Sequence, residues 1–311
     1  MKVYNGIEEF KGNGNSIVTI GTFDGVHEGH RTILHRLKEL AHLKQGETVI
    51  ITFWPHPRMI ISSDKPVYLI NTFEEKAELL DNFGIDHLIK IPFTREFSLK
   101  TADEFIQNVL ITAIQTKVLV IGHDHRFGKD RTGDFDYLKK NEQKNGFIVE
   151  EIPPQDVENI TVSSSKIRKA LLEGNVVTAN QYLGSTYSIT GIITTGDKIG
   201  REIGFPTANI LVNYPGKLIP GDGVYVVKVL VENKWHGGML YIGKRPTLQG
   251  VQRTIEVHIF NFNKEIYGES ISVQFLKNIR GDQTFGSLEE LKKQLQRDEI
   301  AAKEILKKNG Y

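Results

Sequence analysis

The segment from Ile17 to His30 holds the residues of this chain that could most clearly do chemistry. A run of apolar and β-branched residues leads into a glycine-rich turn at residues 21–25, and two histidines follow directly. The apolar run is typical of a buried parallel strand, and glycine lets backbone N–H groups approach a ligand closely. A helix that begins after this turn would point its positive end at the same place. The segment therefore predicts a site for an anion such as a phosphate.

His27 and His30 stand three residues apart at the start of the predicted helix, so they share one of its faces. Imidazole rings placed there can donate hydrogen bonds to phosphate oxygens as negative charge builds up on them. Alternatively, the two residues could be a surface pair that caps the turn, because a His-x-Gly-His sequence alone is not specific. Their position directly after a predicted strand favours the anion site.

The composition limits both the class of protein and the kind of partner. With 311 residues and 39% apolar side chains, the chain is long enough for two domains with real cores. Lys and Arg number 39 against 38 Asp and Glu, and the net charge of +1 gives no electrostatic reason to bind nucleic acid or an anionic membrane. A small ligand is expected instead.

The absence of cysteine excludes disulfides, thiolate catalysis and cysteine-bound zinc. The amino terminus lacks the apolar core of a signal peptide, and no apolar run in the sequence reaches the length of a membrane span. We therefore expect a cytoplasmic protein with no membrane partner.

The first part of the chain alternates short apolar strands with helical stretches, which predicts an open, Rossmann-like α/β sheet of parallel strands with both faces covered. Capping boxes mark two of the helix starts, at Thr72 with Glu75 and at Thr101 with Glu104. The predicted strands are Ser16–Gly21, Thr48–Trp54, His87–Phe93, Lys117–Gly122 and Phe147–Pro153.

After Gly184 the pattern changes to alternating, β-branched segments separated by Gly, Pro and Asn, which predicts a compact antiparallel β-barrel. A final helix is predicted to begin at Ser287, to form a capping box with Glu290 and to pack on the barrel. These changes predict two domains, residues 1–184 and 185–311. The predicted barrel strands are Tyr187–Gly196, Gly223–Glu232, Lys234–Gly243, Thr254–Phe262 and Glu269–Ile279.

Three further polar segments follow predicted strands, at the edge where open α/β sheets bind ligands: residues 53–57, 122–128 and 162–168. In the last of these, serine hydroxyls and helix-start N–H groups can receive a phosphate, and Arg168 can form a forked contact with it. Plain N-capping by Ser163 or Ser164 is the alternative. In residues 122–128, the alternating His123, Asp124 and His125 could suggest a metal site, but without matching distant ligands hydrogen-bonded structure is more typical.

In the second domain, residues 196–209 form a glycine-rich loop in which Lys198 could meet a phosphate. The loop is not a Walker A motif, because no Gly-Lys-Ser/Thr opens a helix, and an ordinary barrel loop is the alternative. Further along, period-two alternation sends Glu256 and His258 to the face opposite Ile255 and Val257. A solvated outer face would also explain that alternation.

Together these segments resemble the nucleotidyltransferase superfamily, and the match narrows to bacterial bifunctional riboflavin kinase/FAD synthetases. Residues 21–30 are similar to the first signature of that family, and residues 163–168 to its Ser/Thr-rich arginine motif. Turns like those at residues 55–57 and 126–128 recur in it. The resemblance spans essentially the whole chain, and it implies a Rossmann-like nucleotidyltransferase domain followed by an antiparallel β-barrel riboflavin kinase domain with a terminal helix.

The resemblance implies that the first domain adenylylates FMN with MgATP and releases pyrophosphate. It assigns His27 and His30 to the triphosphate in the transition state, and Arg168 and Ser164 to its outer phosphates. Asp124 would lie near the flavin substrate. Lys166 stands where arginine is common in the family, without removing an essential group. The nucleotide site would further be shaped by Gly21, Phe23 and Asp24.

For the second domain, the resemblance implies phosphorylation of riboflavin. Residues 204–209 look like the magnesium and ATP motif of the kinase, in which Thr207 and Asn209 would offer hard oxygen atoms to Mg²⁺. Glu256 matches the general base that takes the proton of the riboflavin 5′-hydroxyl. Lys198 and Gly200 are assigned to the nucleotide site. Magnesium is expected to arrive with ATP rather than in a preformed cage.

The resulting hypothesis is a two-domain enzyme that converts riboflavin to FMN and FMN to FAD. Its partners would be riboflavin, FMN, FAD, ATP, ADP and pyrophosphate, with no nucleic acid, and it would be a monomer or a weak homo-oligomer. The alternatives are a chain that keeps only one activity and a flavin-sensing protein that binds without turnover. The presence of both residue sets argues against the first, and the near-neutral charge argues against a nucleic-acid-binding regulator.

Overall fold

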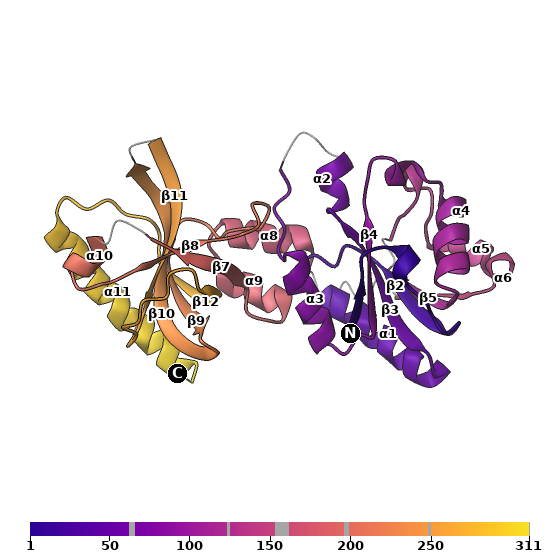
Figure 1. The fold of residues 1–311 in the computed structure, drawn as a ribbon, viewed down its shortest axis with the longest axis horizontal. Coiled ribbons are helices and arrows are strands. Elements are labelled where there is room, and N and C mark those ends of the chain that lie inside the picture. The colour runs from indigo at the N-terminus through magenta and orange to yellow at the C-terminus, as the bar shows by residue number, and fades with distance from the viewer. Residues whose placement is uncertain (62–65, 123–124, 153–161, 196–198, 248–249, 311) are drawn as a thin grey trace. The chain divides into compact units, whose positions relative to one another are not determined.

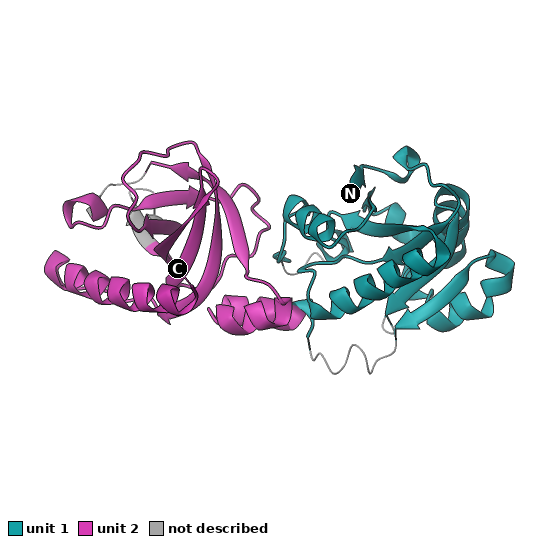
Figure 2. Cartoon of the chain, turned by 90° about the horizontal axis from the view of Figure 1, so that it is seen from below, with its two compact units in different colours: residues 1–164 teal, residues 165–311 magenta. Residues whose placement is uncertain are grey.

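The computed structural model describes residues 1–61, 66–122, 125–152, 162–195, 199–247 and 250–310. The chain divides into two compact units, residues 1–164 and 165–311, coloured separately in Figure 2. Helix α9 (Val176–Leu183) and all but the first residue of α8 (Ser164–Leu172) therefore group with the second unit. This division falls before residue 184, and the proposed domain limits at that position remain a prediction.

The first unit contains a six-stranded sheet with the strand order β1-β4-β3-β2-β5-β6 (Figure 1). Every neighbouring pair in it is parallel, which confirms the predicted α/β sheet. All five predicted strands are present: β2 (Ser16–Ile20), β3 (Glu47–Trp54), β4 (His87–Pro92), β5 (Thr116–Gly122) and β6 (Ile148–Ile152). The sixth strand, β1 (Lys2–Tyr4), was not predicted, because three largely exposed residues carry no apolar pattern.

Two hydrophobic cores cover the two faces of this sheet. Helices α1 (Glu28–Lys44) and α3 (Phe73–Asn82) pack against one face, together with residues such as Ile50 and Leu88. The opposite face is covered by α4 (Ala102–Phe105), the π-helical segment η3 (Ile106–Ala113) and α5 (Phe135–Lys140). With both faces covered, a ligand can reach the sheet only at the ends of its strands.

The helix signals in the sequence match the helix ends. Both capping boxes, at Thr72 and Thr101, form as predicted. Ser287 caps α11 (Leu288–Lys308), where its hydroxyl accepts from the Glu290 N–H at 3.2 Å, but the Glu290 carboxylate accepts from the N–H of Gly286. The remaining short helices are η1 (Ile7–Glu9), α2 (Pro57–Ile61), η2 (Phe97–Leu99), η4 (Lys129–Arg131), α6 (Glu142–Asn145) and α10 (Ile199–Glu202).

The second unit is an antiparallel barrel, as predicted. The barrel is closed, and its strand order is β10-β11-β8-β7-β12-β9. One of its strands, β8, was not among the predicted strands; it has four residues and begins within the segment 196–209 that was predicted as a glycine-rich loop. The strands are β7 (Ser188–Thr194), β8 (Ala208–Leu211), β9 (Gly223–Val231), β10 (Lys234–Thr247), β11 (Gly250–Ile259) and β12 (Ser270–Arg280).

The terminal helix α11 packs on the barrel through Ala302 and Leu306, which join a core cluster with Val226. A buried ion pair adds to this contact. Asp298 in α11 is 1% exposed, and its carboxylate lies 2.9 Å from a terminal guanidinium nitrogen of Arg280 at the end of β12. None of the helices in the described part of the chain has both the length and the apolar character needed to cross a membrane.

Replacing Asp298 with Ala should destabilise the barrel by about 3 kcal/mol, because Arg280 would keep its charge in a largely buried place without the carboxylate. The chain has two tryptophans, Trp54 in the first unit and Trp235 in the second. Urea unfolding followed by Trp235 fluorescence in a Trp54→Phe background would measure the change.

The control for this substitution is Glu299→Ala on the same helix, because the Glu299–Lys303 pair is solvent-accessible and should contribute less than about 1 kcal/mol. Equal losses in the two variants would contradict the role assigned to the buried pair.

Candidate active sites

The predicted anion turn joins β2 to α1 and has an uncommon backbone. Phe23 and Val26 have positive φ angles of 45° and 41°, which side chains with a Cβ rarely adopt. Both side chains are buried in the core between the sheet and α1, so packing holds this conformation. The turn leads into His27, which caps α1 by accepting the N–H of His30 on its Nδ1 atom at 3.4 Å. The backbone thereby places both histidines at the start of the helix.

The rings of His27 and His30 stack with centroids 3.8 Å apart and an interplanar angle of 18°. The two histidines therefore lie together, as the spacing predicted. Burial lowers the pKa of His30 well below 6.5, and the neighbouring His27 ring and the positive charge of Lys76 lower it further. The ring is therefore neutral at pH 7. Its Nδ1 atom is buried and has no hydrogen-bond partner among the described residues.

Asp24 connects this turn to the segment that precedes α3. Its carboxylate is 2% exposed and accepts the backbone N–H of Ile70 at 3.0 Å and that of Asn71 at 3.2 Å. The carbonyl oxygen of Asp24 accepts the hydroxyl of Ser164 at 2.9 Å, although the two residues are 140 positions apart. The structure therefore brings Ser164 to the histidine turn, as the polar segment at residues 162–168 suggested.

The other predicted site residues of the first domain do not all lie at the histidine turn. Phe23 lies in the turn and its ring is 5.0 Å from that of His30, and a Cβ atom added at Gly21 would lie 2.9 Å from the Phe23 ring. Arg168 is half-buried in α8, within the second unit, and its contact with the outer phosphates stays a prediction. Asp124 lies outside the described residues.

Sequence reasoning missed Lys76, a buried residue of α3. Its side chain is 3% exposed, and its Nζ atom donates to the Thr52 hydroxyl at 3.4 Å and lies 5.5 Å from the centre of the Trp54 ring. A signal was available, since Lys76 stands in the helical repeat at the buried positions that Phe73 and Leu80 also occupy. Burial lowers its pKa to about 8, although the negative charge of Asp24 acts in the opposite direction.

The barrel brings three predicted residues together. Glu256 in β11 stands opposite Asn209 in β8, and its carboxylate accepts the hydroxyl of Thr207 at 3.3 Å. The Thr254 hydroxyl donates to its other oxygen at 3.2 Å. Glu256 is 4% exposed, so a solvated outer face does not describe it.

Described residues that precede β8 contact β11 on this face of the barrel. His258 donates from Nδ1 to the carbonyl oxygen of Pro206 at 2.7 Å, and Phe205 is buried. Glycine is required at position 200, because a Cβ atom there would lie 2.3 Å from the carbonyl oxygen of Phe205. The contact of Gly200 with a nucleotide stays a prediction, and Lys198 lies outside the described residues.

The donor set in the barrel suits a hard cation. Thr207, Asn209 and Glu256 offer a hydroxyl, an amide and a carboxylate oxygen, which Mg²⁺ prefers. In the described ranges, no three His, Cys, Asp or Glu side chains gather in a way that could hold a metal ion. Three oxygen donors leave the other positions of an octahedral ion such as Mg²⁺ to water and phosphate.

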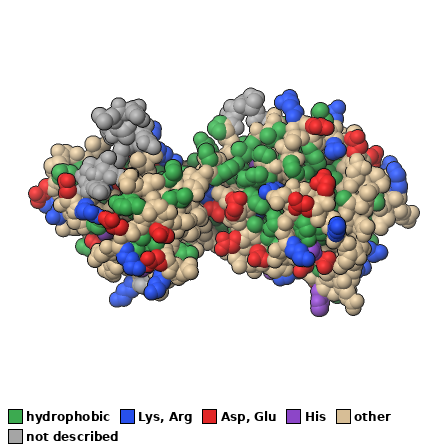
Figure 3. All heavy atoms as spheres, in the orientation of Figure 1, with side chains coloured by type: hydrophobic (Ala, Val, Ile, Leu, Met, Phe, Trp, Pro, Cys, Tyr) green, Lys and Arg blue, Asp and Glu red, His purple; other side chains and the backbone are tan. Residues whose placement is uncertain are grey.

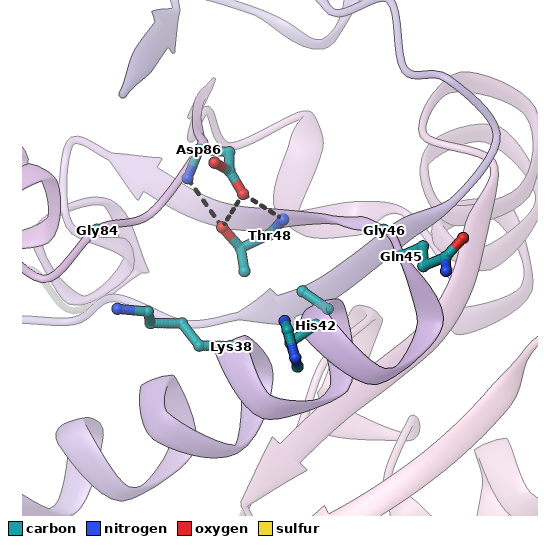
Figure 4. A pocket seen from close by; sticks show the side chains of 8 residues that line it. Lys38, His42, Gln45, Gly46, Thr48, Gly84 and Asp86 are labelled. Carbon is teal, nitrogen blue, oxygen red and sulfur yellow. Dashed lines mark hydrogen bonds between the residues drawn. The ribbon is translucent and has the colours of Figure 1, made fainter.

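A cavity of about 530 Å³ lies elsewhere, between the last turns of α1 and the first residues of β3 (Figure 4). Thr48 and Asp86 line it and are hydrogen-bonded to one another: the Thr48 N–H and hydroxyl both donate to the Asp86 carboxylate, at 2.9 and 2.7 Å. This cavity is at the amino end of the parallel strands, whereas the histidine turn follows the carboxyl end of β2. The general rule for open α/β sheets favours the turn as the ligand site.

The fold and the two sites define a two-domain enzyme that joins a nucleotidyltransferase-like sheet to a kinase-like barrel, and comparison with known proteins agrees. A family model described as FAD synthetase matches residues 10–166, and one described as riboflavin kinase matches residues 183–306. The bifunctional riboflavin kinase/FMN adenylyltransferase of Escherichia coli K12 is 37% identical over 93% of this chain and 92% of its own length. Its counterpart in Listeria monocytogenes is 38% identical over 92% of this chain and 90% of its own length. The chain belongs to the bifunctional riboflavin kinase/FMN adenylyltransferase family.

A solved structure shares the fold over nearly the whole chain. The crystal structure of a macrolide-efflux protein from Streptococcus pneumoniae has a TM-score of 0.88 and 32% identity, and the match covers 97% of this chain and 98% of that one. The streptococcal protein carries a different functional name, whereas its fold is the one described above.

The lowered pKa of Lys76 predicts how stability depends on pH. Between about pH 8 and 10.5 the unfolded chain binds a proton at Lys76 that the folded chain has released, so this residue makes unfolding less favourable as pH rises. Lys76→Met lacks the effect. Its stability relative to the unmodified protein should therefore be highest below pH 8 and should fall as pH approaches 10.

Urea unfolding of both proteins across this range, followed by Trp54 fluorescence in a Trp235→Phe background, would measure that difference. Lys38→Met is the matched control, because Lys38 also lies over an aromatic ring, that of Phe83, but is exposed. A difference for Lys76→Met that stays constant with pH would show that Lys76 is not destabilised by burial.

Proposed function

We propose that this protein phosphorylates riboflavin to FMN in the barrel and adenylylates FMN to FAD at the edge of the parallel sheet, with ATP as the second substrate of both reactions. One observation carries the proposal: several of the side chains that the family resemblance assigns to each reaction lie close together within one unit. His27, His30 and Ser164 gather at the turn, and Thr207, Asn209 and Glu256 gather in the barrel.

For adenylyl transfer, a phosphate oxygen of FMN attacks the α-phosphorus of ATP, and the bond from that phosphorus to the leaving pyrophosphate breaks. Negative charge grows on the phosphate oxygens during this step. The start of α1 and the N–H groups of the stacked histidines can stabilise that charge, and the core packing of the turn fixes them in advance. Arg168 would add a forked contact to the outer phosphates.

For phosphorylation, Glu256 would accept the proton of the riboflavin 5′-hydroxyl while that oxygen attacks the γ-phosphorus of ATP and ADP leaves. The hydroxyls of Thr207 and Thr254 hold one carboxylate oxygen each, which orients the base. Mg²⁺ bound with ATP would neutralise phosphate charge, and Thr207 and Asn209 are the residues that would hold it. Most of the rate enhancement would come from positioning and charge neutralisation.

The charge of the chain is balanced, which favours small substrates over nucleic acid. On the face drawn in Figure 3, basic and acidic side chains are interspersed, and the net charge of the chain is +1. We propose that riboflavin, FMN, FAD, ATP, ADP and pyrophosphate are the partners, without nucleic acid. A cytoplasmic monomer or weak homo-oligomer completes the proposal, in keeping with a chain that has no cysteine.

Glu256→Gln should lower the rate of FMN formation by about a hundredfold or more, because the amide cannot accept the proton of the 5′-hydroxyl. Conversion of added FMN to FAD should continue at the rate of the unmodified protein. Purified protein is incubated with MgATP and either riboflavin or FMN, and the flavins are separated by chromatography.

His30→Ala should produce the reverse pattern, with FAD formation reduced about a hundredfold and FMN formation unchanged. Each variant thus serves as the folding control for the other. Formation of a single product by the unmodified protein would support a chain that keeps one activity, and bound flavin without any product would support a flavin-sensing protein.

A further inference from the structure

Lys76 has no part in the reactions proposed above, although its contacts lead directly to the histidine turn. The buried ammonium donates to the Thr52 hydroxyl at 3.4 Å, and that hydroxyl donates to the backbone oxygen of Thr22 at 3.3 Å. Thr52 follows the apolar part of β3, close to the carboxyl end of that strand, and Thr22 is part of the turn. A single side chain therefore joins the positive charge of α3 to the backbone that presents the histidines.

The buried position of Lys76 disfavours its charged form. Its side chain is 3% exposed, and burial outweighs the attraction of Asp24, so that its pKa is lowered to about 8. At pH 7 the ammonium is still mostly protonated. An apolar side chain would pack in the same place without this cost, since replacing a buried charge by a hydrophobic residue is often neutral or stabilising. A charge held in this way is a candidate for a functional role.

Buried polar atoms around the turn lack partners among the described residues. The Nδ1 atom of His30 is one, and the side-chain oxygen of Asn71 is another, in a residue that is 8% exposed. Asn71 adjoins the same turn, because its backbone N–H donates to the Asp24 carboxylate. Buried polar atoms in native proteins are nearly always paired, so these atoms indicate a place that a ligand completes.

We infer that Lys76 is a positioning residue for adenylyl transfer: a fixed positive charge beneath the glycine turn that acts on the triphosphate of ATP through the His27–His30 pair. The inference rests on the proposed adenylyltransferase function and adds a residue to it. Lys76 is called a positioning residue because its described contacts are with Thr52 and Trp54 rather than with a site open to the substrate.

The physical basis is electrostatic. Without nucleotide, the positive charge of Lys76 and the adjacent His27 ring oppose protonation of His30, whereas the negative charge of Asp24 raises the pKa of Lys76. A triphosphate brings negative charge to the turn, so the positive charge of Lys76 favours its binding, while the His30 ring that Lys76 helps to keep neutral still has one N–H to donate. A buried lysine contributes a charge that needs no reorganisation when the transition state forms.

The test compares Lys76→Met with Lys76→Arg and with Lys38→Met, the exposed control. The kinetics of FAD formation from FMN are measured against ATP from about pH 6 to 9, a range that covers histidine titration. The ring of His30 is titrated by NMR in the protein without nucleotide, its signal being assigned by its loss in His30→Gln. Trp54 fluorescence reports that the first unit is folded, and Lys76→Gln replaces Lys76→Met should the latter not fold.

We expect Lys76→Met to lower kcat/KM for ATP by about tenfold in FAD formation, less than the loss of a direct donor would cost. The titration of His30 should move to higher pH, because the positive neighbour is gone. FMN formation from riboflavin should be unchanged. Lys76→Arg should keep most of the activity, and Lys38→Met should match the unmodified protein in both measurements.

A kcat/KM within about twofold of the unmodified value, or a His30 titration that does not move, would overturn the inference. A purely structural role for Lys76 would lower stability without moving that titration. If the unmodified protein forms no FAD from FMN, the proposed function itself fails, and the titration of His30 still decides whether Lys76 acts on the histidine pair.

Discussion

The first site depends on the buried carboxylate of Asp24. Two backbone N–H groups, of Ile70 and Asn71, donate to it, and together they hold a turn whose φ angles side chains with a Cβ seldom adopt. An unpaired carboxylate at this depth would be strongly unfavourable, so the turn and the segment before α3 have to stay together. That constraint fixes where α1 begins, and with it the stack of His27 on His30.

In the barrel, the register of the strands positions the residues of the second site. Pairing of β11 with β8 sets Glu256 opposite Asn209, and a shift of one residue would turn Glu256 away from Thr207. Glu256 is buried there, and the hydroxyls of Thr207 and Thr254 donate to its two carboxylate oxygens. One site is thus built on a helix start and the other on a ladder of strands, so a change in one unit need not alter the chemistry of the other.

Most of the fold could be predicted because the signals are local. The five strands of the sheet are apolar runs, the helix starts at Thr72 and Thr101 are capping boxes, and the barrel strands alternate. The missed strands β1 and β8 have three and four residues and gain their partners only through tertiary pairing. In the candidate sites, motif spacing predicted that His27 and His30 lie side by side, because the start of one helix determines their geometry, whereas the roles of His27, His30 and Glu256 in the reactions stay predictions.

Lys76 shows what such reasoning leaves out. Periodicity puts it on the buried face of α3, but a lysine among apolar residues is ordinarily taken for one that reaches solvent with its long side chain. Its burial follows from where α3 lies against β3, which no short segment encodes. The hydrogen bond to Thr52 and the influence on His30 depend on three elements at once. Residues that act on a site through others are therefore the ones that need coordinates, whereas residues that face the substrate leave a pattern in the sequence.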